Sequence, residues 1–160
     1  MRKVCEVYLI SSSASDDERG VELTFPVSQY EMMDAFEQIH TKSPGDVYWQ
    51  GDGFYCFDYL APHLDESMSI FEFNTLTQQL SKLDERQETA MNGLLQMQVN
   101  KHMQENSGTV TVQDLMMLAS NVDRCYVLAD VHSNEDLGKF YVENGFRDDL
   151  DALPDSVYDL

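Results

Sequence analysis

Two amphipathic segments in the middle of the chain constrain its fold more than any other feature. In residues 69–80, apolar side chains recur at helical spacing, at Ile70, Phe73, Leu76 and Leu80. Residues 84–100 repeat the pattern with Ala90, Met91, Leu94, Leu95 and Val99. Two helices of this kind cannot bury their apolar stripes without a further partner, so both must pack on the rest of the chain.

Start signals place these two helices within a central unit. Ser69 precedes the first helix, and Glu72 follows three residues later, which is the spacing of a capping box. The second helix is expected to start at Asp84. A change in composition at Ala61-Pro62 comes before the pair, so residues 62–104 are predicted to form a central helical unit.

The segment before this unit alternates strand and helix signals. Residues 3–10 and 21–27 have the β-branched and aromatic content of strands. A capped helix is predicted after Ser28, with its apolar face made by Met32, Met33, Phe36 and Ile39. Segments 47–50 and 54–59 are then expected to pair as a hairpin around Gly51-Asp52-Gly53. Residues 1–61 therefore predict an N-terminal α+β unit.

The remaining residues, 105–160, predict a second α+β unit. Thr111 and Asp114 mark the start of one helix, whose expected apolar positions are Leu115, Met116, Leu118 and Ala119. Residues 125–130 have strand composition, and Ser133 with Asp136 opens another helix, with Gly145 as its C-terminal cap. The expected fold class is α+β, with three small units in series forming an elongated molecule.

Charge sets the class of partner. The 160 residues include 29 Asp and Glu but only 10 Lys and Arg, which gives a net charge of −19. An excess of this size attracts basic partners and opposes direct binding to nucleic acid or to an anionic membrane. The chain has no apolar run of about 18 residues that would span a bilayer. We expect a cytoplasmic protein with free thiols at Cys5, Cys56 and Cys125.

The search for catalytic motifs favours a binding protein over an enzyme. The four histidines are isolated and lack the spacing of a zinc site, and no phosphate-binding glycine motif is present. The acidic runs 16–18 and 148–151 do not match a calcium-binding loop. Residues 139–146 are similar to a turn of GNAT acetyltransferases, whose glycine-rich cofactor loop this chain lacks. We therefore predict neither cofactor nor metal.

The carboxylates are spread over all three predicted units. No Lys or Arg lies between Lys42 and Lys82, and nine acids occupy residues 130–160. Duplex DNA carries about one charge per 1.7 Å of its axis, so 19 charges match roughly 30 Å of duplex. Carboxylates held at fixed spacings on folded elements could therefore copy the charge of DNA.

Several segments resemble the ArdA family of antirestriction proteins, in matching order. The resemblance is clearest in residues 69–76 (SIFEFNTL), followed by Leu83-Asp84-Glu85 and Leu94-Leu95. It continues through 112–118 and 136–145 (DLGKFYVENG), and more loosely through 153–157.

The resemblance implies a curved homodimer that imitates bent DNA and occupies the DNA-binding groove of type I restriction–modification enzymes. The carboxylates expected to stand in for phosphates are Asp65, Glu66, Glu72, Asp84, Glu85, Glu88, Asp114, Glu135, Asp136, Glu143, Asp148, Asp149, Asp151 and Asp155. The alternative is an acidic adaptor that binds another basic protein of a mobile element through charge together with an apolar patch.

Overall fold

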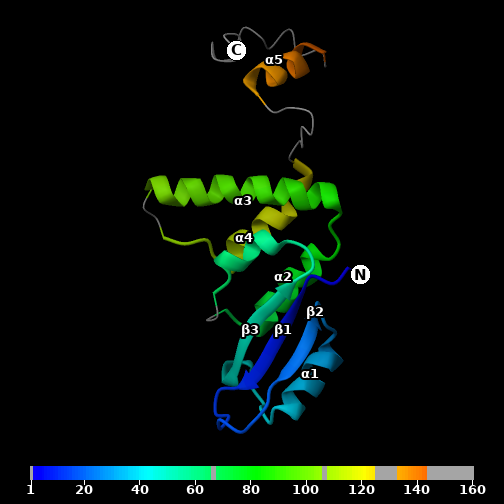
Figure 1. Cartoon of the computed structure of the whole chain (residues 1–160), viewed down its shortest axis with the longest axis vertical. Helices are drawn as coiled ribbons and strands as arrows, with labels where there is room; N and C mark the ends of the chain where they lie inside the picture. Colours follow the sequence, from blue (N-terminus) through cyan, green and yellow to red (C-terminus); the bar gives the residue numbers. More distant parts are fainter. Residues whose placement is uncertain (1, 66–67, 106–107, 125–132, 144–160) are drawn as a thin grey trace. The chain divides into compact units, whose positions relative to one another are not determined.

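The computed structural model describes residues 2–65, 68–105, 108–124 and 133–143, and it has the expected α+β class (Figure 1). The chain divides into two compact units, Met1–Cys125 and Tyr126–Leu160. In the second unit the structure describes helix α5 (Asn134–Glu143). The predicted strand at 125–130 and the cap at Gly145 lie outside the described residues. The elongated arrangement of three units stays a prediction.

The first unit is built on a three-stranded antiparallel sheet. Its strands are β1 (Cys5–Ser11), β2 (Val21–Phe25) and β3 (Val47–Phe54), in the order β2-β1-β3 (Figure 1). Side chains alternate across a strand, so Cys5, Val7 and Leu9 are buried on one face while Tyr8 is exposed on the other. One face of the sheet therefore belongs to the core.

Helix α2 (Ile70–Leu80) covers the core face through aromatic contacts. The ring of Phe73 stacks on Trp49 with centroids 4.6 Å apart, and it lies 5.7 Å from the ring of Phe25. Helix α1 (Gln29–Gln38) adjoins α2 through Phe36 and Phe71, whose rings are 5.8 Å apart. All four predicted apolar positions of α2 are buried, as expected.

Helices α3 (Glu85–Glu105) and α4 (Val112–Ser120) complete this unit. Helix α4 packs against both α2 and α3, and Leu95 of α3 and Leu115 of α4 are fully buried. The two central helices therefore bury their apolar faces against different partners. Helix α2 packs on the sheet and on α4, and helix α3 packs on α4. Helix α3 runs one residue past the predicted boundary at residue 104.

The predicted hairpin around Gly51-Asp52-Gly53 is wrong. These residues continue β3, in which Glu6 pairs with Gly53 while Val7 pairs with Gly51. Asp52 is the extra residue of a β-bulge, so the two glycines accommodate a local kink in a strand rather than a chain reversal. The predicted strand 54–59 is replaced by the 3-10 helix η2 (Asp58–His63), entered through Phe57 with a left-handed backbone (φ 56°).

Two smaller predictions on helices also need correction. Met33 is 58% exposed, because it lies about 100° around α1 from Met32 and outside the arc that faces the core. The Ser69 hydroxyl caps α2 by accepting from the Phe71 N–H at 3.3 Å, where the prediction had a reciprocal pair with Glu72.

Candidate binding surface

Most of the described candidate carboxylates lie at helix starts. Glu72 occupies the first turn of α2, Glu85 that of α3, and Glu135 that of α5, and all three are exposed. The first turn of a helix carries unpaired N–H groups and the positive end of the helix dipole, so a carboxylate there stabilises the helix. The same geometry holds the charge at a fixed place on the surface.

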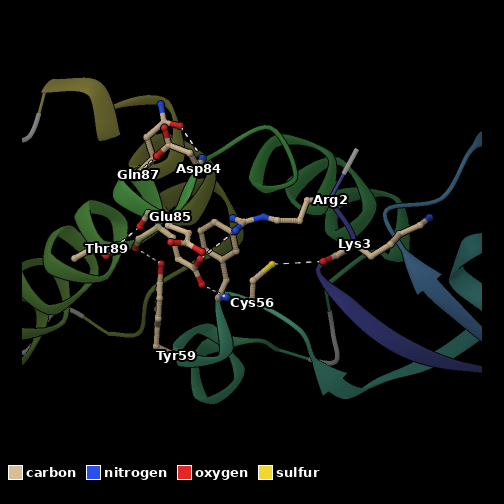
Figure 2. A network of polar contacts seen from close by, with 10 residues as sticks. Arg2, Lys3, Cys56, Tyr59, Asp84, Glu85, Gln87 and Thr89 are labelled. Atoms are coloured by element: carbon tan, nitrogen blue, oxygen red, sulfur yellow. Dashed lines mark hydrogen bonds and ion pairs between the residues drawn. The ribbon is translucent and has the colours of Figure 1, made fainter.

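The start of α3 gathers acids from two segments of the chain. The Asp84 carboxylate accepts from the Gln87 N–H at 2.8 Å, and the Gln87 side chain accepts from the Asp84 N–H at 2.9 Å (Figure 2). The Gln87 amide also donates to Asp123 at 2.7 Å. Asp123 is thus a third carboxylate beside Asp84 and Glu85 at the start of α3. It lies 36 residues from Gln87, so no local spacing in the sequence could predict that it belongs to this group.

A cleft of about 740 Å³ brings Asp65 and Glu72 to the start of α4. Its lining combines these carboxylates with apolar and hydroxyl groups from two distant segments, among them Met68, Thr111 and Val112. The sequence predicted both acids but not that residues 109–113 would face them. The cleft therefore offers negative charge beside an apolar wall.

Asp114 has a structural role as well as its charge. It forms the predicted capping box with Thr111, whose N–H donates to its carboxylate at 2.9 Å. Its carboxylate also lies 3.9 Å from Nε2 of His102, and it is only partly exposed. Asp114 therefore couples the start of α4 to the last turns of α3.

Both carboxylate oxygens of Glu88 bind within the protein. Oε2 lies 3.3 Å from Nη1 of Arg2, and Oε1 accepts from the Phe57 N–H at 2.7 Å. The Glu88 carbonyl accepts from the Tyr59 hydroxyl at 2.6 Å (Figure 2). The side chain is 23% exposed. Glu88 thus joins α3 to the segment that follows β3.

The residues of this network are partly buried. Burial, followed by the nearby Glu88 charge, raises the pKa of the Tyr59 hydroxyl, which therefore stays a hydrogen-bond donor. The guanidinium carbon of Arg2 lies 5.2 Å from the centroid of the Phe57 ring, within range of a cation–π contact. Phe57, with its left-handed backbone, is thus contacted by Glu88 through its N–H and by Arg2 over its ring.

The remaining candidates belong to the second unit or fall outside the description. Glu135 lies 3.3 Å from Nζ of Lys139, and the two form an exposed pair one helical turn apart. Asp136 lies in the first turn of α5, where its N–H donates to the Ser133 hydroxyl at 3.1 Å. The candidates of which the structure describes no side chain are Glu66, Glu143, Asp148, Asp149, Asp151 and Asp155.

Within residues 2–65, 68–105, 108–124 and 133–143, no three His, Cys, Asp or Glu side chains are grouped so that they could hold a metal ion. Among the helices in those ranges, none is both long and apolar enough to cross a membrane.

Comparison with known proteins returned no match to a family model, to a curated protein or to a solved structure.

Proposed function

We propose that this protein is an acidic DNA mimic, without a catalytic step of its own, that occupies the DNA-binding groove of a type I restriction–modification enzyme. One observation carries the proposal: exposed carboxylates such as Glu72, Glu85 and Glu135 occupy the first turns of helices. Their spacing within each unit is therefore set by backbone geometry, which a mimic of regularly spaced phosphates requires. The net charge of −19 supplies the sign and the magnitude.

The same proposal includes a cytoplasmic location, where such an enzyme acts, and a homodimer that would lengthen the acidic surface. We leave Glu88 out of the proposed surface, because Arg2 and Phe57 already occupy its carboxylate. The other thirteen predicted carboxylates remain candidates.

The test is competition for a purified type I methyltransferase core between the full chain and a duplex that carries the enzyme's recognition sequence. We expect the duplex to displace the protein, and the affinity to fall between about 50 and 200 mM salt, because groove binding depends on ion release. Binding that is insensitive to salt and unaffected by duplex would contradict the proposal.

Two variants with equal charge separate a specific surface from bulk acidity. The triple change Glu72→Gln, Glu85→Gln and Glu135→Gln and the triple change Asp16→Asn, Asp17→Asn and Glu18→Gln each reduce the net charge from −19 to −16. Three lost contacts of about 0.5 kcal/mol each predict roughly tenfold weaker binding for the first variant. An equal loss in both variants would point to bulk charge alone.

The cleft favours a second candidate function, an acidic adaptor for another basic protein of a mobile element. Its apolar residues Met68 and Val112 lie beside Asp65 and Glu72, a combination that suits a protein surface better than a mimic of phosphates alone. An adaptor of this kind would stay bound to its partner in the presence of excess duplex DNA.

A further inference from the structure

The face of the sheet that points away from α2 forms a surface of its own. We call it the open face and define it by Glu6, Tyr8, Ile10, Glu22, Tyr48 and Gly53. The strand register places Tyr8 directly opposite Glu22, Ile10 opposite Tyr48, and Glu6 opposite Gly53. Side chains opposite each other on antiparallel strands have Cβ atoms about 5 Å apart, so these residues make one continuous patch.

Tyrosine rings dominate this patch and are exposed. Tyr48 is 62% exposed, and Tyr55, which follows β3, is 61% exposed. The Tyr55 hydroxyl donates to a carboxylate oxygen of Glu6, which brings its ring to the edge of the open face. The Tyr8 hydroxyl accepts from the Gly20 N–H at 2.8 Å. Two of the three rings are therefore held in place by hydrogen bonds.

The charge of the open face has a single sign. Strands β1, β2 and β3 contain no Lys, Arg or His. Glu6 lies two residues before Tyr8 on β1, and Glu22 lies opposite Tyr8 on β2. Carboxylates beside aromatic rings attract cations, and a guanidinium suits both partners because it stacks on rings and binds carboxylates through paired N–H groups. The same carboxylates repel phosphate, which disfavours a nucleic acid that would stack on the rings.

The open face also has room for an incoming side chain. A Cβ added at Gly53 would meet nothing within 4 Å, so the space above Gly53, directly opposite Glu6, is open. A side chain at position 53 would extend into this open space and would not require the backbone to move.

We propose that the open face binds arginine side chains of a basic protein segment. A guanidinium group stacks on the ring of Tyr48 or Tyr55, and the carboxylates of Glu6 and Glu22 on the same face attract its charge. This site is independent of the proposed action on a restriction enzyme, and it can be tested without one.

The test measures binding of a fluorescent eight-residue peptide of alternating arginine and glycine to the full chain by anisotropy. Tyr48→Ser removes one ring of the open face. Tyr30→Ser is the matched control, because Tyr30 is 85% exposed but lies on α1. Neither change alters the net charge. An exposed cation–π contact predicts a loss of about 2–5-fold for Tyr48→Ser and unchanged affinity for Tyr30→Ser. Equal affinities of the two variants would overturn the proposal.

A steric variant tests the same site without removing a ring. Gly53→Leu places a bulky side chain on the open face opposite Glu6. Gly93→Leu is its control on α3, where an added Cβ also meets nothing within 4 Å. We expect the peptide to bind at least several-fold more weakly to Gly53→Leu, with both variants folded by circular dichroism. Normal peptide binding by Gly53→Leu, or tighter binding of a single-stranded oligonucleotide than of the peptide, would contradict an arginine site.

Discussion

The side-chain amide of Asn74 satisfies both backbone hydrogen-bonding groups of Val27. Its oxygen accepts from the Val27 N–H at 3.0 Å, and its nitrogen donates to the Val27 carbonyl at 3.0 Å. Both residues are buried, so the pair ties helix α2 to the segment between β2 and α1. Asn74 lies within the segment 69–76 on which the predicted family resemblance mainly rests, and in this structure its side chain holds the fold together.

Asn74→Ala should strongly destabilise the first unit. The change leaves a buried N–H and a buried carbonyl of Val27 without partners, which costs about 2–4 kcal/mol in the free energy of unfolding. Asn100→Ala is the control, because Asn100 is exposed on α3. Urea unfolding of both variants measures the difference, and equal midpoints would show that the Asn74 amide contributes nothing.

Glu88→Gln should cost stability that Glu85→Gln does not. The first change leaves the guanidinium of Arg2 without its counter-charge in a half-buried site, for a loss of about 1–2 kcal/mol. The second removes an exposed first-turn charge, for a loss of about 0.3–0.5 kcal/mol. Thermal unfolding at one salt concentration compares them. A larger loss for Glu85→Gln would argue against the role assigned to Glu88.

Gly20→Ala should destabilise the sheet, whereas Gly53→Ala should not. A Cβ at Gly20 would lie 2.2 Å from the Leu9 carbonyl oxygen and 2.6 Å from the Tyr8 ring, so backbone must move. Overpacking of this kind costs about 1–3 kcal/mol. Gly53 has open space, and alanine there should be neutral or slightly stabilising, by up to about 1 kcal/mol. Chemical unfolding of the two variants provides the comparison, and a reversed order would refute the packing argument.

Alkaline pH should destabilise the protein through Cys5. Burial, with a smaller contribution from Cys56, raises the pKa of the Cys5 thiol from 9.0 to about 12. Above pH 9 the unfolded thiol loses its proton while the folded thiol keeps it, so unfolding releases a proton and the free energy of unfolding falls with pH. One such proton is worth about 1.4 kcal/mol per pH unit.

Cys5→Ala removes this dependence and provides the measurement. Between pH 9.5 and 10.5, we expect the free energy of unfolding to fall less steeply in the variant, by about 1 kcal/mol per pH unit. The Tyr59 hydroxyl is present in both proteins, so its contribution to the pH dependence of the free energy of unfolding cancels when the two are compared. Parallel pH profiles would show that the Cys5 thiol is not protected in the folded state.

Local signals in the sequence predicted the helices well. The capping boxes at Ser28 with Glu31 and at Thr111 with Asp114 form as expected, because a cap depends on residues only three positions apart. The apolar spacing of α2 likewise predicted its buried side. The Gly51-Asp52-Gly53 segment failed because glycines suit both a turn and a bulge, and pairing with β1 decides between them.

The composition of the candidate surface depends on contacts that no local pattern encodes. Asp123 joins Asp84 only after α3 and η3 (Val122–Arg124) pack together. Glu88 and Glu85 look alike in the sequence, but Arg2, 86 positions away, pairs with only one of them. Predicting which acids are free to bind a partner therefore requires the tertiary structure.

Trp49 gives the two units different spectroscopic properties. It is the only tryptophan in the chain, its indole N–H donates to the Met68 carbonyl at 2.7 Å, and its ring stacks on Phe73. Its emission should be blue-shifted in the folded protein and should shift to the red when the sheet separates from α2. Because residues 126–160 contain no tryptophan, intrinsic fluorescence follows the melting of the first unit and is silent about the second.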